Sequence, residues 1–291
     1  MVDVEVVVEA KNMLGEGPMW NGRDQALYWT DAKERPRIQR WNPKTGSVDE
    51  WAMPDLIGSF VFREDGGLIA GLKSGFYKLD LERGSADLFH DPEPDKPNNR
   101  LNDGKCDRRG RYWCGSLDDS GEPSAALYRV DPDFSVHKMD GGVKCSNGIA
   151  WSPDNKTMYF SDSRNETCYQ YDYDIESGNI SNKRIWVDNR DKLARIDGAT
   201  VDSEGYYWAA HIRHWHIAKY SPDGIVVDTI EVPVQHPTMC TFGGEKLDTL
   251  YVTSGRVFLG SDALKEQPLA GSLFAIHGTG AKGIPEPFFK G

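Results

Sequence analysis

Four polar side chains with oxygen atoms that can bind a cation recur at a regular spacing along this chain. They are Glu16, Asn102, Asn147 and Asp197. Carboxylate and amide oxygens suit hard divalent cations such as Ca²⁺, Mg²⁺ and Mn²⁺, and Zn²⁺ or Fe²⁺ also accepts carboxylates. If folding brought these side chains together, the two acids would lose hydration and repel each other, and a bound cation would relieve both costs. The four residues therefore predict a divalent metal centre.

The spacing of these residues predicts a repeat architecture. Six equivalent positions, 16, 58, 102, 147, 197 and 238, lie 41 to 50 residues apart, and an apolar residue follows four places after each. A polar or Gly-containing turn and an aromatic or aliphatic strand come next, as in RYWCGS (111–116) and TMYFSD (157–162). This period matches one four-stranded propeller blade, and short strands between turn residues indicate β structure. The alternative is another β-rich fold whose turns share this spacing by chance.

We therefore predict an all-β, six-bladed β-propeller with a central metal site, and we expect residues 1–291 to form a single domain. The run VDVEVVV (2–8) lies outside the first unit, and we expect it to add a strand to the last blade and close the ring. In a propeller all inner strands run in the same direction along the channel. The six equivalent positions, including Gly58 and Thr238, would therefore form a ring at one end.

Each polar residue of the ring also has a simpler interpretation, because Asn and Asp often cap turns at the ends of strands. Four of them in one register favour the metal site, and so few protein ligands would leave positions open for water and substrate, as in catalytic sites. Arg100 could hold a polyhydroxylated or anionic ligand, or it could form a surface salt bridge. Asp103 stands where Gly follows the other three polar residues, and is a candidate to support the ligands from behind.

The segment HIRHWH (211–216) holds three His side chains near the predicted ring. Strand alternation would place His214 and His216 on one face and Trp215 on the other, with no carboxylate close in sequence. We therefore interpret the segment as shaping the substrate pocket or as structural, in preference to a second metal site. The chain has no GxSxG, P-loop or GxGxxG motif, so a Ser-His-Asp enzyme is not supported.

Composition restricts the classes of partner. The formal net charge of −11 argues against nonspecific binding to nucleic acid or to an anionic membrane. We find no stretch that resembles a signal peptide or a transmembrane span. The five cysteines are odd in number and lack CxxC spacing, which predicts a reduced, cytoplasmic protein and argues against a thiolate metal site.

Five motifs in combination resemble one known family. They are LGEGPMW (14–20), NNRLNDGKCDRRGRYWCGSL (98–117), CSNGIAWSPDNKTMYFSDS (145–163), IDGATVDSEGYYW (196–208) and CTFGGEKLDTLYVTSG (240–255). Together they resemble the senescence marker protein/regucalcin/gluconolactonase family over nearly the whole chain. Members of that family are six-bladed propellers, and many hydrolyse sugar lactones with a divalent metal.

The resemblance implies roles for particular residues. The metal-binding Glu, Asn and Asp of the family correspond to Glu16, Asn147 and Asp197, and the Asp is also the proposed general acid/base. The Arg and Asn that hold substrate match Arg100 and Asn102. The implied protein is a hydrolase that opens a sugar (aldono)lactone to the aldonic acid. One divalent ion (Ca, Mg, Mn, Zn or Fe) would polarise the carbonyl, with Asp197 as general acid/base. A metal-bound carboxylate is a weak base, so the alternatives are that Asp197 acts through its unligated oxygen or that the ion activates the water directly.

Two features depart from the family pattern. Animal members carry a Glu where this chain has Ser120, and the segment 211–216 replaces a small Gly-containing loop, so the substrate cannot be copied from relatives. Two other functions would keep the same fold. One is a phosphotriesterase or aryl-lactonase, and the other is a noncatalytic calcium-binding regulator or interaction propeller.

Overall fold

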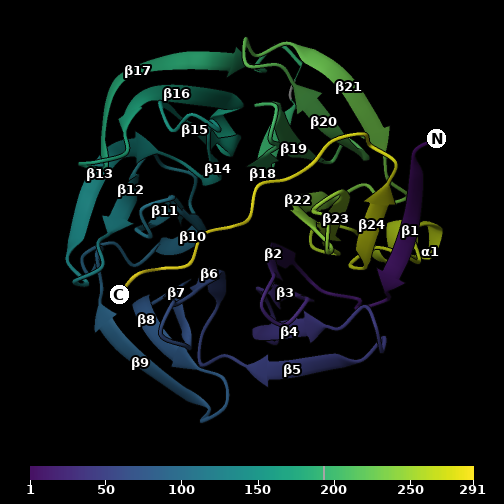
Figure 1. Ribbon diagram of the computed structural model, residues 1–291, viewed down its shortest axis with the longest axis horizontal. Helices are drawn as coiled ribbons and strands as arrows, with labels where there is room; N and C mark the ends of the chain where they lie inside the picture. The colour runs from purple at the N-terminus through teal and green to yellow at the C-terminus, as the bar shows by residue number, and fades with distance from the viewer. Residues whose placement is uncertain (193) are drawn as a thin grey trace.

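Six four-stranded antiparallel sheets surround a central axis in the computed structural model, which describes residues 1–192 and 194–291 (Figure 1). Blades 1 to 3 are built from β2 (Gly15–Asn21), β3 (Ala26–Asp31), β4 (Arg37–Trp41) and β5 (Val48–Ala52); β6 (Ile57–Phe62), β7 (Leu68–Leu72), β8 (Gly75–Asp80) and β9 (Ser85–His90); and β10 (Asn99–Cys106), β11 (Tyr112–Asp118), β12 (Ala125–Val130) and β13 (Val136–Val143).

Blades 4 to 6 repeat the arrangement. They are built from β14 (Ser146–Trp151), β15 (Thr157–Asp162), β16 (Thr167–Asp174) and β17 (Asn179–Asp188); β18 (Arg195–Val201), β19 (Tyr207–Ile212), β20 (His216–Tyr220) and β21 (Val226–Glu231); and β22 (Pro237–Gly243), β23 (Thr249–Ser254), β24 (Leu273–His277) and β1 (Asp3–Val8). A 3-10 helix, Ser163–Asn165, and a short helix α1, Ser261–Glu266, lie in connections. No helix in the described part of the chain has the length and apolar character needed to span a bilayer.

The N-terminal strand closes the ring. Strand β1 pairs antiparallel with β24, from Asp3 opposite His277 to Val8 opposite Leu273. Blade 6 therefore contains both the first and the last strand of the chain (Figure 1). This pairing covers the edge of β24, which would otherwise be open to another chain. The predicted six-bladed propeller and its closure by the N-terminal run are therefore confirmed.

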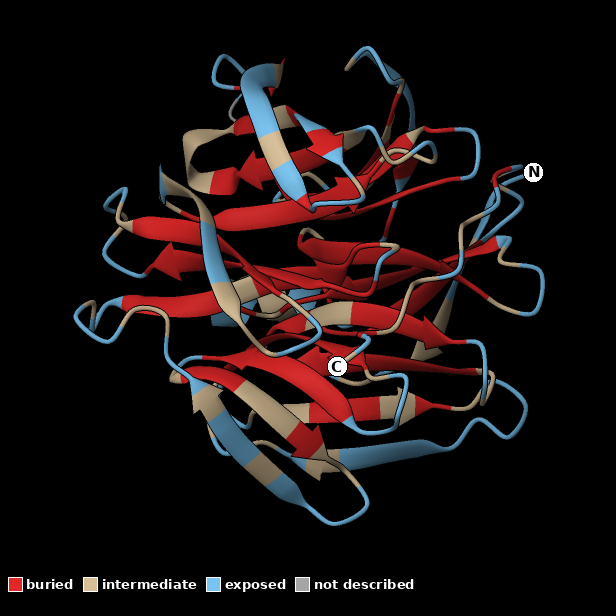
Figure 2. Ribbon diagram, turned by 60° about the vertical axis from the view of Figure 1, so that its left-hand side comes forward, coloured by how far each residue is buried: buried red, intermediate tan, exposed pale blue. Residues whose placement is uncertain are grey.

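Burial follows the position of a strand within its blade. The inner strands and their neighbours are mostly buried, whereas the outermost strands such as β5 and β9 are largely exposed (Figure 2). Aromatic rings fill the space between blades: Trp113 of blade 3 meets Trp151 of blade 4 edge-on at 6.0 Å, and Trp208 meets Phe242 at 5.8 Å. All five cysteines are buried and unpaired. Packing covers both faces of the second strands of the blades, and several of these, such as β7 (LIAGL), are therefore apolar with little alternation.

The DxxG turns that follow the inner strands of blades 3 and 5 are held by the same set of hydrogen bonds. Asp107 and Asp202 each accept backbone N–H groups of their own turn. Each also accepts the indole N–H of a Trp on the next strand, Trp113 at 2.9 Å and Trp208 at 2.8 Å. A buried carboxylate thus satisfies the turn and fixes the hairpin to the core.

The C-terminal segment, residues 278–291, crosses one face of the ring (Figure 1, yellow). Its backbone pairs with the far ends of the inner strands: the N–H of Phe289 donates to Phe62 O at 2.8 Å, and the N–H of Glu64 donates to Phe289 O at 2.8 Å. The Phe289 side chain is fully buried. One end of the channel is therefore covered by the chain itself.

Candidate active site and metal centre

Every inner strand has a pairing irregularity at the position that the repeat singles out. The register shifts between Glu16 and Met19 in blade 1 and between Asn147 and Ala150 in blade 4, and the other four inner strands shift at the matching place. A β-bulge bends its strand and re-aims a side chain. The bulges therefore direct polar groups into the channel from strands that are otherwise packed on both faces.

Glycines after two of the polar residues make these bends possible. Gly17 and Gly148 have φ of 56° and 59°, in the left-handed region that residues with a Cβ rarely adopt. A Cβ on Gly148 would also lie 2.3 Å from the hydroxyl oxygen of Tyr207. The recurring pairs Glu16-Gly17 and Asn147-Gly148 are therefore local requirements of the site.

The four polar side chains line a single cavity at the start of the inner strands, and Arg100 lines it with them. Its volume is about 250 Å³, near the lower end of small-molecule pockets, which span roughly 300–1,000 Å³. Side chains from neighbouring blades meet directly there, because Nδ2 of Asn102 donates to Oδ1 of Asn147 at 3.0 Å. The predicted register thus brings Glu16, Asn102, Asn147 and Asp197 together.

The other two positions of the predicted ring do not face this cavity, which corrects the expectation of a six-membered ring. A Cβ at Gly58 would lie 2.5 Å from the carbonyl oxygens of Leu101 and Asn102, so the backbone of β10 occupies that place. Thr238 is fully buried, and its hydroxyl donates to the carbonyl oxygen of Gly15. Both residues join neighbouring blades.

Hydrogen bonds orient the two amides for different tasks. Nδ2 of Asn147 donates to Oγ of Ser163 at 2.8 Å, which leaves Oδ1 on the side of Asn102 with a second lone pair available. Asn102 is more fully engaged, since its Oδ1 accepts from Arg100 Nη1 and its Nδ2 donates to Ser146 O, both at 3.0 Å. Asn147 can therefore offer an oxygen to a cation, while Arg100 and Asn102 form a hydrogen-bonded pair.

The electrostatics of the two acids fit a divalent cation. Burial, followed by the charges of Asp197 and Asp103, raises the pKa of Glu16 well above its usual value. Burial and Asp103 raise the pKa of Asp197 to about 8, and Arg100 opposes both shifts. Two acids that resist ionisation beside an amide oxygen form an all-oxygen set that hard cations favour. Among the described residues no three His, Cys, Asp or Glu converge as a metal site, so any centre here would combine these two acids with the Asn147 amide.

Asp103 supports this arrangement from behind, as predicted. Its Oδ2 accepts the backbone N–H of Ile149 at 3.1 Å, two residues after Asn147, and the side chain is buried. The bond joins β10 to β14 beside the bulge. Asp103 therefore helps to hold the strand that carries the Asn147 amide.

The segment 211–216 is a hairpin turn between β19 and β20, so alternation along a continuous strand does not apply to it. Arg213 and Trp215 adopt φ of 74° and 61°, and Nε2 of the buried His211 lies 2.8 Å from the Tyr220 hydroxyl. The lining of the cavity, as far as the described residues define it, takes Ile212 and Arg213 from this turn and no His. The turn thus shapes the pocket through its tip.

The acidic loop after β11 differs from the family pattern in a defined way. Ser120 turns back and donates its hydroxyl to Asp118, so it does not face the cavity. Asp119 does line the cavity and lies 3.8 Å from Nε of Arg100. A neighbouring acid, Asp119, therefore lies beside Arg100 in this loop.

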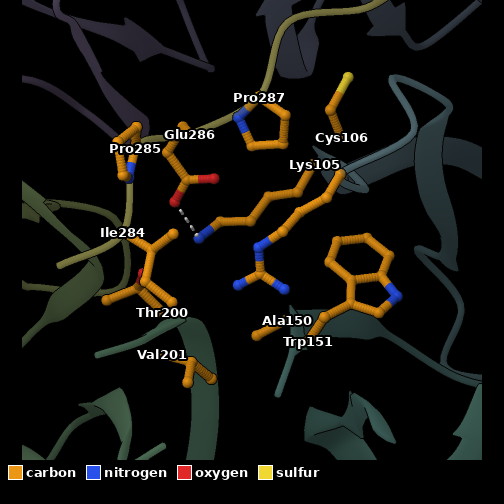
Figure 3. Close-up of a pocket in the computed structure, with 11 residues that line it drawn as sticks. Lys105, Cys106, Ala150, Trp151, Thr200, Val201, Ile284, Pro285, Glu286 and Pro287 are labelled. Carbon is orange, nitrogen blue, oxygen red and sulfur yellow. Dashed lines mark hydrogen bonds and ion pairs between the residues drawn. The ribbon is translucent and has the colours of Figure 1, made fainter. Parts of the chain in front are cut away.

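The opposite end of the channel holds a much smaller cavity of about 40 Å³ (Figure 3). Its lining includes residues that lie three or four places after Asn102, Asn147 and Asp197 on the inner strands, and the C-terminal segment covers it. Nζ of Lys105 pairs there with Glu286 at 3.0 Å, and Pro285 and Pro287 flank the pair (Figure 3). A second cavity on this side, of about 340 Å³, is lined by Trp20, Phe242 and Phe288 among others and holds none of the four polar site residues. The polar lining, and not the volume, therefore favours the Glu16 end as the ligand site.

Sequence reasoning missed several basic side chains that line the site cavity. Lys33 and Arg164 follow β3 and β15 in the similar segments TDAK (30–33) and SDSR (161–164), and Arg213 occupies the equivalent place after β19. Lys33 lies two residues after Asp31, which pairs with Gly15 next to Glu16. Arg164 and Arg213 stand in the same relation to Asn147 and Asp197. This second register, at the rim, would have revealed them.

Comparison with known proteins identifies relatives over the full chain. The family model described as SMP-30/Gluconolactonase/LRE-like region matches residues 14–256. The 6-deoxy-6-sulfogluconolactonase of Pseudomonas putida is 38% identical over 290 residues, covering 99% of each chain. Regucalcin of Oryctolagus cuniculus is 35% identical over 298 residues, covering 100% of this chain and 99% of that protein.

A solved structure agrees with these matches. Regucalcin of Agrobacterium tumefaciens strain C58, described as a calcium-binding protein, aligns with a TM-score of 0.93 at 27% identity, covering 98% of this chain and 96% of that chain. The resemblance carried by the five sequence motifs is thereby confirmed. The chain belongs to the SMP-30/gluconolactonase/LRE-like family.

Proposed function

We propose that this protein hydrolyses a sugar lactone to the open-chain aldonic acid in a reaction that depends on one divalent cation. The observation that carries the proposal is the gathering of Glu16, Asn147 and Asp197 with the Arg100–Asn102 pair around one cavity. A relative at 38% identity is a 6-deoxy-6-sulfogluconolactonase, which supports the same class of reaction. An interaction propeller would have no need of two acids whose ionisation is opposed by burial.

Glu16, Asn147 and Asp197 would hold the cation through their side-chain oxygens. When bound there, the cation would supply positive charge that polarises the lactone carbonyl. The two carboxylates and the Asn147 Oδ1 come from blades 1, 4 and 5, so the residues of one blade alone could not form this site. The regucalcin of A. tumefaciens, described as calcium-binding, is consistent with such a role.

Arg100 and Asn102 would orient the sugar. The Arg100 side chain is buried, and its Nε, 3.8 Å from Asp119 Oδ1, is too far for that ion pair to be a hydrogen bond and has no other hydrogen-bond partner among the described residues. A buried donor of this kind is costly to leave unpaired, and a substrate hydroxyl can satisfy it. Holding the lactone in one orientation would convert a bimolecular encounter with water into a reaction between positioned groups.

Asp197 would exchange the proton. Its carboxyl accepts a proton from the water that attacks the carbonyl carbon, and a new C–O bond forms. The same proton then passes to the ring oxygen as the ring C–O bond breaks, so the product is a hydroxy acid. Asp197 has two carboxylate oxygens, so one could bind the cation while the other exchanges the proton. Positioned acid–base catalysis contributes roughly 10²–10⁴-fold to such reactions.

The test is acid release from neutral aldonolactones, followed in a pH-stat after chelation and after return of single divalent cations. We expect turnover to disappear with verified cation removal and to return with at least one cation. A phosphotriester and an aryl lactone in the same assay separate the related activities. Turnover of only those two compounds would replace the proposed substrate, and cation binding with no turnover of any compound would favour a calcium-binding regulator.

A further inference from the structure

Three cations at the rim of the site cavity have no acidic partner. Five basic side chains line the cavity, and two are paired: Arg100 lies 3.8 Å from Asp119, and Arg195 lies 3.3 Å from Glu166. The others are Lys33, Arg164 and Arg213. Across residues 1–192 and 194–291, no ion pair joins these three to a carboxylate. Arg164 donates to the backbone carbonyl oxygen of Asp118, so its charge, like those of the other two, is not neutralised by a carboxylate, in a chain whose formal net charge is −11.

The repeat places these cations on the three blades that would hold the metal ion. Lys33, Arg164 and Arg213 belong to blades 1, 4 and 5 and follow the second strand of each blade. The inner strands of the same blades carry Glu16, Asn147 and Asp197. The cavity therefore has an acidic floor and a basic rim, separated along the channel.

The rim cations are held close together at some energetic cost. Burial lowers the pKa of Lys33, and the charges of Arg100 and Arg164 lower it further, with Asp119 opposing. Lys33 and Arg213 both lie over the ring of Phe258, at 5.9 and 5.6 Å from its centre. Phe258 is 68% exposed and, like Arg213, has a left-handed backbone. Strained backbone and crowded like charges are typical of ligand sites.

The charges of the cavity lining indicate which kind of ligand group would neutralise the three rim cations. The acids that line it are Glu16, Asp119 and Asp197. If Glu16 and Asp197 bind the cation and Asp119 pairs with Arg100, no carboxylate of the lining remains for the three rim cations. An anionic group of the substrate would balance them through charge-assisted hydrogen bonds.

Resting on the proposed lactone hydrolysis, we propose that the substrate carries a sulfonate or phosphate group at the end of the sugar furthest from the lactone carbonyl. Lys33, Arg164 and Arg213 bind this group at the rim while the carbonyl lies at the floor. Both anions present tetrahedral oxygens that a guanidinium can bind with two parallel hydrogen bonds. The rim thus selects a charged sugar lactone over its neutral counterpart.

The experiment compares kcat/KM for one sugar lactone in three forms: unsubstituted, with a terminal sulfonate, and with a terminal phosphate. We expect the wild-type protein to prefer at least one charged form by ten-fold or more, mainly through KM, and the preference to shrink as salt is raised. Arg164→Gln should lower this preference at least ten-fold. The matched control is Arg256→Gln, because Arg256 occupies the equivalent place in blade 6 and does not line the cavity.

Equal or better use of the neutral lactone by the wild-type protein would overturn the inference and leave lactone hydrolysis intact. An Arg164→Gln variant that loses activity equally on charged and neutral forms would also overturn it. Calorimetric binding of the aldonic acid products, with and without the terminal anion, reads the same preference without turnover. Tighter binding of the charged acids with no hydrolysis of any lactone would reject the proposed function and retain the anion site. Equal binding of charged and neutral acids, again with no hydrolysis, would reject both the lactonase function and the anion site. The two charged lactones decide between sulfonate and phosphate.

Discussion

Asp197 shows how strongly a place in the fold changes a side chain. On the surface its carboxyl would be ionised at neutral pH, but burial at the channel floor beside Asp103 raises its pKa to about 8. No catalytic motif surrounds it in the sequence, and its neighbours in space come from other blades. Its chemistry therefore follows from the repeat that brings those blades together.

We predict that Asp197→Asn lowers kcat/KM for the preferred lactone by at least about 100-fold, because the amide keeps the shape and loses the proton exchange. The measurement is acid release with a divalent cation supplied, at substrate concentrations well below KM. Asp87→Asn, on the exposed face of β9, is the matched control and should retain wild-type activity. A loss of less than three-fold in Asp197→Asn, in protein with wild-type circular dichroism, would remove Asp197 from the proposed mechanism.

Much of the site was predictable from single residues and their period. Glu16, Asn102, Asn147 and Asp197 share one register, and closure of a repeat ring brings one register to one end of the channel. The backbone of β10 fills the space beside Gly58, and the Thr238 hydroxyl bonds to Gly15 instead of facing the cavity. Both features depend on packing between blades, which no local sequence pattern encodes. The rim cations were missed because they belong to a second register that only the strand pairing makes evident.

At the scale of single elements, the bulged inner strands are the devices that position the site. We predict that Gly148→Ala destabilises the protein by more than about 2 kcal/mol. The left-handed backbone alone costs an alanine roughly 1–2 kcal/mol, and the new methyl would lie 2.3 Å from the Tyr207 hydroxyl oxygen.

Gly17→Ala is the matched variant, since Gly17 has nearly the same φ and nothing lies within 4 Å of its added Cβ. It should cost only the backbone strain, about 1–2 kcal/mol. Urea unfolding of the two variants measures the difference. Equal destabilisation would show that the contact with Tyr207 relaxes freely and that only backbone conformation selects glycine after Asn147.

The β19–β20 hairpin should make stability depend on pH. Burial and the nearby His216 and His214 lower the pKa of His211 to about 3 in the folded protein, against about 6.5 in an unfolded chain. Between these values the unfolded state binds the proton more readily. Stability is therefore greatest above pH 6.5 and falls as the pH decreases towards 3.

For His211 this loss amounts to about 1.5–2 kcal/mol between pH 7 and pH 5. We predict that His211→Gln, which keeps a neutral partner for Tyr220, flattens the pH dependence of the unfolding free energy by this amount. His90→Gln, at an exposed position on β9, should leave the slope unchanged. A His211→Gln slope equal to that of the wild-type protein would mean that the imidazole becomes protonated without unfolding.

Elements were predictable where the repeat and turn chemistry agree. The strands, the DxxG turns at Asp107 and Asp202, and the closing N-terminal strand all follow from patterns that are local or periodic. The C-terminal segment has no such pattern: it binds through isolated backbone hydrogen bonds and one buried ring, Phe289, to surfaces that exist only after the blades have formed. Its course across the channel was therefore not foreseen.

At the scale of the whole molecule, the site ties together blades that do not all touch. Glu16, Asn147 and Asp197 project from blades 1, 4 and 5, so a bound cation would act as a cross-link at the hub. Without it, two buried acids oppose each other at the same place, as the raised pKa values of both indicate. The site should therefore weaken the ring when empty of cation and strengthen it when loaded.

This opposition predicts a reversal of stability in Glu16→Gln. In chelator at pH 8.5 the variant should unfold at a higher temperature than the wild-type protein, because the amide removes the cost of burying a carboxyl group that is ionised in the unfolded chain. With a divalent cation at 100 times its Kd the wild-type protein should gain about 2.7 kcal/mol, the variant much less, and the order should invert. Differential scanning calorimetry in both conditions measures this, with the exposed Glu82→Gln as control. A Glu16→Gln protein that is less stable than the wild type in chelator would show that Glu16 is held by hydrogen bonds and needs no cation, which would contradict the proposed metal centre.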